Sequence, residues 1–327
     1  MFWMVWGKLA LLLGIIYIFG TRASRSADII AEKKGWSRGF MGVIFLAMIT
    51  SLPELFTGIS AVRLVKDPDM ALGEIFGSCV FNLMIIALID VFLRKREVFR
   101  VQHPGYVSRP FHYFLILITV TTVLIPLNLN VGIFHIGLSS ALIMGLYLAF
   151  VRLMYHQRRD GQSGDAPCYS AKSLRRETLS FIFSSLVIIG VGVYLPVVGE
   201  EIIALMGWSS SFVGVVFLAF VTSFPELIVC LAAARMGSLE MFFGNISGSN
   251  LFNLSIIFLV DLFFFEGFLL RQVSPVYLLI GSLTVVMTLV VIRGLRQSAR
   301  RTILGVLSIY SLLLAVLYLV NMAISYQ

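Results

Sequence analysis

Two short segments of the sequence each place a glutamate directly after a proline inside an otherwise apolar stretch. They read TSLPE at residues 50–54 and TSFPE at residues 222–226. An ionised carboxylate near the centre of a bilayer costs about 2.5–3.5 kcal/mol on insertion scales, so two cost roughly 5–7 kcal/mol. No lysine or arginine falls in the middle of these stretches to neutralise them. A bound cation is therefore the favoured explanation, with protonation as the alternative.

Each of these segments belongs to a longer repeat. Residues 35–55, GWSRGFMGVIFLAMITSLPEL, recur as GWSSSFVGVVFLAFVTSFPEL at residues 207–227. A second block at residues 73–90, GEIFGSCVFNLMIIALID, recurs as GNISGSNLFNLSIIFLVD at residues 244–261. The matched positions of the two glutamates indicate one shared site rather than two separate ones.

The repeated blocks supply oxygen atoms of several kinds around the two carboxylates. Proline removes a backbone donor and clashes with the carbonyl four residues earlier, so each motif should free backbone carbonyl oxygens. The second block places a serine and an asparagine four residues apart, on one face of a helix. Such an all-oxygen set suits Ca²⁺ or Na⁺ and argues against zinc or copper. The side chains concerned are Glu54, Glu226, Thr50, Ser51, Thr222, Ser223, Ser78, Asn82, Ser249 and Asn253.

The composition places these segments in a membrane. Of the 327 residues, 59% are hydrophobic and only 13% are charged, and the mean hydropathy is +0.95. A bilayer core needs about 20 apolar residues per helix. The sequence predicts an all-α polytopic membrane protein with ten transmembrane helices, at residues 3–20, 38–62, 71–93, 110–127, 131–154, 179–205, 210–234, 240–265, 274–292 and 302–322.

The basic residues predict how these ten helices are oriented. Most of the lysines and arginines fall in alternate loops, including the polar loop 156–177, which we therefore expect on the cytoplasmic side, with both termini outside. This loop separates a first repeat (1–155) from a second (178–327), each with five helices. An odd number of helices per repeat inverts the second relative to the first, a common plan in secondary transporters with a site at the midplane.

The two blocks resemble the alpha-repeats of the cation/calcium exchanger superfamily, most closely its sodium/calcium exchanger branch. The family pattern is Gly-Thr-Ser-x-Pro-Glu followed by Gly-Asn-x-x-Gly-Ser-Asn. The resemblance implies a non-enzymatic antiporter of the plasma (inner) membrane that needs no cofactor and no nucleic acid, and that exchanges Ca²⁺ for Na⁺ by alternating access. It also implies ligand roles. Ca²⁺ would bind Glu54, Glu226 and the backbone carbonyls of Thr50 and Thr222, and the Na⁺ sites would use both glutamates with Ser51, Ser78, Asn82, Ser223, Ser249 and Asn253.

The sequence departs from this pattern at several positions. Ile49 and Val221 stand where the family has its leading glycine, and Cys79 stands where the first block should carry asparagine. Glu74 replaces the asparagine that the second block keeps as Asn245, and it adds a possible third carboxylate that we expect near one membrane face. These departures leave both Na⁺ and H⁺ open as the coupling ion.

Three other functions use the same residues. A cation channel would show flux without a coupled counter-ion. An intramembrane enzyme would use the two glutamates as acid and base, although no Ser-His or Cys-His motif accompanies them. A family member that no longer transports would account for the departures. A further matched pair, Asp90 and Asp261, is compatible with either helix-end contacts or a proton path.

Overall fold

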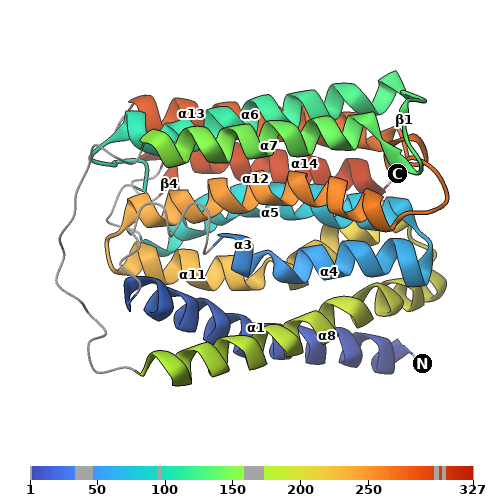
Figure 1. Ribbon diagram of the computed structural model, residues 1–327. Helices are drawn as coiled ribbons and strands as arrows, with labels where there is room; N and C mark the ends of the chain where they lie inside the picture. The colour runs from blue at the N-terminus through green and yellow to red at the C-terminus, as the bar shows by residue number, and fades with distance from the viewer. Residues whose placement is uncertain are drawn as a thin grey trace.

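The computed structural model describes residues 2–33, 47–93, 98–157, 173–297, 302–303 and 307–326. These residues form a bundle of long helices that lie side by side (Figure 1). The elements are α1 (Phe2–Lys33), α3 (Ala47–Thr50), α4 (Leu52–Ser60), η2 (Ala61–Val65), α5 (Pro68–Leu93), α6 (Pro104–Leu127), β1 (Gly132–Ile133), β2 (Ile136–Gly137), α7 (Leu138–Gln157), α8 (Leu174–Met206), α9 (Ser210–Phe212), η4 (Val213–Leu218), α10 (Ala219–Thr222), α11 (Phe224–Arg235), α12 (Leu239–Phe263), η5 (Leu269–Arg271), α13 (Val276–Gln297), β3 (Thr302–Ile303), β4 (Leu307–Ser308) and α14 (Ile309–Tyr326).

Most of the predicted membrane spans appear as single helices. In the described part of the chain, 8 helices are long and apolar enough to cross a membrane: α1, α5, α6, α7, α8, α12, α13 and α14. The stretch from α9 to α11 adds one more if its two parts, which meet at an angle of 48°, are taken as one broken span. Of the predicted span 38–62, residues 38–46 lie outside the described residues, and the rest forms α3, α4 and η2.

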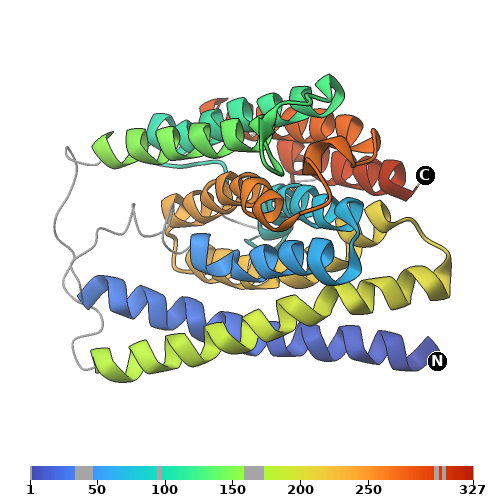
Figure 2. The same cartoon turned by 45° about the vertical axis from the view of Figure 1, so that its right-hand side comes forward.

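Two helices, α5 and α12, form the centre of the bundle. Both are apolar around most of their circumference and buried along most of their length, as expected for helices surrounded by others. The pair α1 and α8 packs along one side, and α6, α7, α13 and α14 form the other side (Figures 1 and 2). The broken segments α3–α4 and α10–α11 lie between the α1–α8 pair and the central helices.

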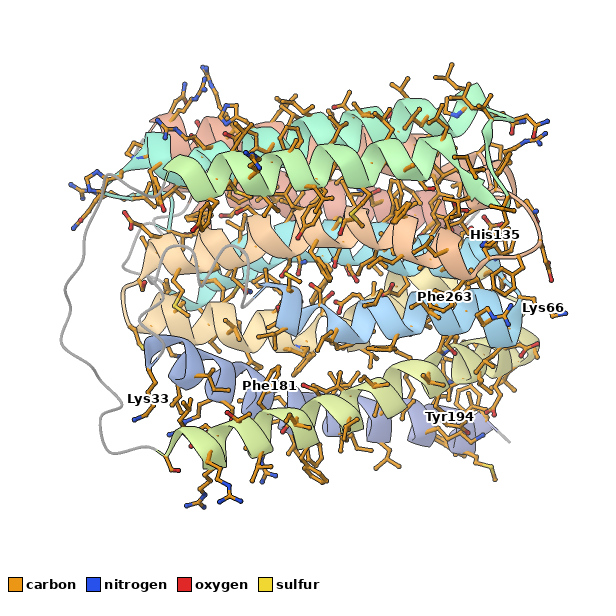
Figure 3. All side chains as sticks on the ribbon, in the orientation of Figure 1. Lys33, Lys66, His135, Phe181, Tyr194 and Phe263 are labelled. Carbon is orange, nitrogen blue, oxygen red and sulfur yellow. The ribbon has the colours of Figure 1, made fainter. Side chains whose placement is uncertain are left out.

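The chain runs in opposite directions in corresponding helices. In Figure 1, α1 runs from right to left and α8 from left to right, while α3–α4 runs from left to right and α11 ends on the left. Both termini lie at the right-hand end. Figure 3 labels Lys33 at the left-hand end and Lys66 and His135 at the right-hand end, which gives each end of the bundle a reference residue.

Two of the predicted spans begin later than the sequence indicated. Residues 131–137 form an antiparallel hairpin of β1 and β2, in which Gly132 pairs with Gly137, before α7 begins at Leu138. Strands β3 and β4 form a similar hairpin before α14 begins at Ile309. Hydropathy could not distinguish these hairpins from the helices that follow them, because both are apolar. In the first hairpin, Phe134 adopts the positive φ of 56° that is typical of a tight turn.

The matched pair of aspartates anchors these hairpins. Asp261, at the end of α12, accepts hydrogen bonds from the Gly137 amide (2.8 Å) and the Ser140 hydroxyl. Asp90, near the end of α5, accepts hydrogen bonds from the Ser308 amide (2.9 Å) and the Ser311 hydroxyl (2.7 Å). Each carboxylate therefore holds the start of a helix in the other half of the chain. The structure shows helix-end contacts at both positions.

Glycines on α5 allow it to approach the broken segment of the second half. A Cβ atom added to Gly77 would lie 2.5 Å from the Val215 carbonyl oxygen, and one added to Gly73 would lie 2.9 Å from that of Ser211. Val215 belongs to the π-helical stretch η4, which directly precedes α10. Small residues at these positions therefore bring α5 against the backbone that leads into the second Pro-Glu motif.

Candidate cation-binding site

The site begins with two breaks in the helices that carry the Pro-Glu motifs. α3 ends at Thr50 and α4 begins at Leu52, and α10 ends at Thr222 and α11 begins at Phe224. The intervening residues have nearly identical backbone angles, with φ −91° and ψ 15° at Ser51 and φ −84° and ψ 10° at Ser223. Each proline lies in the first turn of the second helix, where its missing N–H is tolerated. The helix is thus interrupted at both motifs, where the sequence predicted that proline frees backbone carbonyl oxygens.

The two motifs are joined by crossed hydrogen bonds. The Ser51 hydroxyl donates to Glu226 Oε1 (3.1 Å), and the Ser223 hydroxyl donates to Glu54 Oε1 (3.0 Å). All four side chains have no exposed surface. Each half of the chain thus supplies a carboxylate to the other half's serine, and the two glutamates belong to one site.

The central helices α5 and α12 add hydroxyl groups in the same crossed manner. Thr50 Oγ1 lies 3.4 Å from Ser249 Oγ on α12, and Thr222 Oγ1 lies 3.5 Å from Ser78 Oγ on α5. All four residues are buried. The structure therefore brings the hydroxyl-bearing residues of both blocks together in pairs, although their sequence positions are far apart.

Several polar atoms of the site lack a hydrogen-bond partner among the described residues. They are Oε2 of Glu54, Oε2 of Glu226, Oδ1 of Asn82, and both amide atoms of Asn253. An unpartnered buried polar atom is costly, and a charged one more so. Carboxylate and amide oxygens in this state are suited to hold a hard cation, which would satisfy them directly.

A cation in this site would need neutral oxygen ligands as well as carboxylates. Among the described residues, no three His, Cys, Asp or Glu side chains are grouped closely enough to hold a metal ion between them. An ion bound to Glu54 or Glu226 would therefore draw its remaining ligands from hydroxyl, amide and carbonyl oxygens, which the broken helices and the central helices provide.

Glu74, the third carboxylate that the sequence adds, is hydrogen-bonded to residues of this site. Its side chain has no exposed surface, and Oε1 accepts hydrogen bonds from the Thr222 hydroxyl (3.0 Å) and the Ser78 hydroxyl (3.4 Å). Its second oxygen, Oε2, has no hydrogen-bond partner in the described part of the chain. Position 74 lies one helical turn before Ser78, on the face of α5 that meets α10.

Cys79 removes one of two amide pairs that the repeat would otherwise form. Asn82 Nδ2 donates to Asn250 Oδ1 (3.0 Å), and Asn250 Nδ2 donates to the Cys79 carbonyl (3.3 Å). The matching pair would join Asn253 to position 79, where a thiol replaces the amide. Asn82 is thus held by an amide, whereas Asn253 has the weaker Cys79 thiol as its neighbour, and neither of its amide atoms makes a hydrogen bond of ordinary geometry within the described residues.

Comparison with known proteins decides the family. The model of the family described as "Sodium/calcium exchanger protein" matches residues 4–156 and 177–326, which is nearly the whole chain. The chain belongs to the sodium/calcium exchanger family. It is therefore a multi-pass integral membrane protein, as its composition and its long apolar helices indicate.

Relatives of this family member occur in bacteria and archaea. The inner membrane protein YrbG of Escherichia coli is 26% identical over 250 residues, which are 71% of each chain. The sodium/calcium exchanger MaX1 of Methanosarcina acetivorans is 30% identical over 103 residues, covering 30% of this chain and 29% of that protein.

Solved structures show the same fold. The sodium-calcium exchanger NCX_Mj superposes with a TM-score of 0.65 over 99% of both chains at 21% identity. YfkE superposes with a TM-score of 0.70 over 97% of this chain and 91% of its own, at 15% identity. At these identities the match shows the all-helical membrane fold.

Proposed function

We propose that this family member is a secondary antiporter that exchanges Ca²⁺ for Na⁺ across the membrane by alternating access. The observation that carries the proposal is the crossed pair of hydrogen bonds between Ser51 and Glu226 and between Ser223 and Glu54. The two carboxylates are fully buried, come from opposite halves, and each keeps one oxygen without a partner among the described residues.

The charge of the two glutamates supports exchange rather than simple binding. Two carboxylates are neutralised by one Ca²⁺ or by two Na⁺, so either load relieves the electrostatic cost of burying them. An empty site would leave both charges uncompensated in a low-dielectric region. The protein should therefore change between its outward-facing and inward-facing states only when a cation occupies the site. Coupled exchange requires this property.

The proposed ligands are those that the sequence predicts. Ca²⁺ would bind the carboxylates of Glu54 and Glu226 and the carbonyls of the residues that precede each break. The Na⁺ ions would use the same carboxylates with the surrounding hydroxyl and amide groups. The complete set is Glu54, Glu226, Thr50, Thr222, Ser51, Ser223, Ser78, Asn82, Ser249 and Asn253, all of which are buried. No cofactor is required for this function.

The architecture that we propose has ten helices in two inverted repeats, 1–155 and 178–327, joined by the loop 156–177. The opposite directions of α1 and α8 and of α4 and α11 support the inversion (Figure 1). With the loop in the cytoplasm, both termini face outward. We place the protein in the plasma or inner membrane, and the inner-membrane relative from Escherichia coli supports this location.

Uptake of radioactive Ca²⁺ into liposomes that contain the purified protein tests the proposal. An outward Na⁺ gradient should drive uptake, and dissipating that gradient with a sodium ionophore should abolish it. Uptake driven only by a pH gradient would assign H⁺ as the coupling ion. Flux that no gradient drives would indicate a channel, and no flux from folded protein would contradict transport.

A further inference from the structure

The two halves of the site differ most at one pair of matched positions. Glu74 on α5 corresponds to Asn245 on α12 in the repeat. Glu74 points to the broken segment of the second half, where Thr222 Oγ1 lies 3.0 Å from its Oε1. Asn245 instead donates from Nδ2 to Cys230 Sγ (3.5 Å) on α11. The first half therefore adds a carboxylate to the site, and the second half does not.

The surroundings of Glu74 are those of an ion ligand rather than of a structural carboxylate. Its hydrogen-bond donors, Thr222 and Ser78, are neutral hydroxyls, so neither brings a charge to balance it. Its Oε2 atom has no hydrogen-bond partner in the described ranges and no contact with solvent. By contrast, Asp261, which acts structurally, uses both of its oxygens to accept hydrogen bonds from Gly137, Ser140 and Leu269.

We propose that Glu74 is a third acidic ligand, which forms with Ser78 and Thr222 a subsite for one monovalent cation beside the Ca²⁺ site. One carboxylate with two hydroxyls is a hard-oxygen set of low charge, which suits Na⁺ better than a divalent ion. Glu74, Ser78 and Thr222 contact one another directly, whereas Glu54 and Glu226 are bonded to Ser223 and Ser51. The cation that we assign to Glu74 is therefore distinct from the Ca²⁺ of Glu54 and Glu226.

This subsite rests on the proposed exchange function and specifies its ion load. With Glu54 and Glu226 alone, two Na⁺ replace one Ca²⁺ at equal charge. With Glu74 ionised as well, the empty site carries a third negative charge and accommodates one more monovalent ion. Ca²⁺ binding should then depend on Na⁺ more steeply than two carboxylates allow.

Equilibrium binding of Ca²⁺ to the purified full-length protein over a series of Na⁺ concentrations tests this inference. In Glu74→Gln, the slope of log Kd against log Na⁺ should fall by about one, because this slope counts the Na⁺ ions that leave as Ca²⁺ binds. Glu74→Asp, which keeps the charge, should retain most of the wild-type slope. The matched control is Glu240→Gln, which removes an exposed carboxylate from the first turn of α12 and should behave as wild type.

The outcomes separate this inference from the function on which it rests. Ca²⁺ binding by Glu74→Gln with an unchanged slope would overturn the subsite and leave the exchange function standing. Failure of the wild-type protein to bind Ca²⁺ at all would reject both. If Glu74→Gln does not fold, Glu74→Asn, which introduces the residue of the second half, replaces it in the same measurement, and an unchanged slope again overturns the subsite.

Discussion

The two halves of this exchanger make matching contacts in two regions, at the Pro-Glu motifs and at the helix ends. They make different contacts along the part of α5 and α12 that lies between these regions. At the centre, the serine of each motif bonds the glutamate of the other (Ser51 to Glu226 and Ser223 to Glu54). At the helix ends, Asp90 and Asp261 each anchor a hairpin of the opposite half. Along α5, Glu74 and Cys79 replace the asparagines found at the matching positions of α12. Glu74 therefore contacts Thr222, whereas its counterpart Asn245 contacts Cys230.

This difference shows what a repeated sequence guarantees and what it does not. Where both copies keep the same residue, the pseudo-symmetric packing reproduces the same contact with similar geometry. Where one copy changes, its former partner must find another contact or remain unpartnered. Asn253 has the Cys79 thiol where the repeat would give it an amide, and Thr222 gains a carboxylate neighbour because position 74 is a glutamate.

The largest expected effect tests the symmetric centre. Glu54→Gln and Glu226→Gln should each lower Na⁺-driven Ca²⁺ uptake by about 100-fold or more, because losing even a group that only supports a metal ligand costs about 10–100-fold. Either change takes away half of the charge that balances Ca²⁺. Both variants should be impaired, because each glutamate accepts a hydrogen bond from the serine of the other motif and supplies one of the two charges.

Liposome uptake with the two purified variants measures this effect, and their thermal unfolding in detergent checks that both remain folded. Glu240→Gln serves as the control for removing an exposed carboxylate. Normal coupled uptake by either Glu54→Gln or Glu226→Gln would contradict a shared site. Loss in only one of them would show that a single half carries the ion.

The helix-end aspartates give a smaller effect on stability. Replacing Asp90 or Asp261 with asparagine leaves buried N–H and O–H donors without a full acceptor, which costs about 1–3 kcal/mol per site. Asp261→Asn should be the more destabilising, because Asp261 also accepts a hydrogen bond from the Leu269 amide (2.8 Å). Thermal unfolding of the two variants measures the difference, and an equal or reversed order would contradict the role assigned to this third hydrogen bond.

The smallest effect concerns the asparagine pair. Asn82→Ala removes the hydrogen bond to Asn250 (3.0 Å), whereas Asn253→Ala removes a side chain whose amide has no partner in the described structure. Asn82→Ala should therefore lower stability by about 1 kcal/mol more than Asn253→Ala. Thermal unfolding without Na⁺ or Ca²⁺ provides the comparison. The substitution Cys79→Asn should give Asn253 an amide partner like the one that Asn250 gives Asn82. We expect it to raise the unfolding temperature of the protein.

Much of the site could be predicted because its determinants are local. The apolar runs predicted the membrane helices, and each proline predicted a helix break at a known position, since proline removes a hydrogen bond from the helix that contains it. The repeat, with its shared offset, predicted that both glutamates serve one site. These features depend on spacing and on the cost of burying charge, which are properties of the sequence itself.

Other features depend on which helix faces which, and only the tertiary structure decided them. The sequence named Glu74 as a third carboxylate without a partner, and the approach of α5 to α10, permitted by Gly73 and Gly77, brings it to Thr222. Asp90 and Asp261 were open to two roles until the hairpins that they anchor were located. The hairpins themselves are as apolar as the helices that they precede, so hydropathy could not distinguish them. Contacts between residues more than a hundred positions apart are set by packing, which no local pattern records.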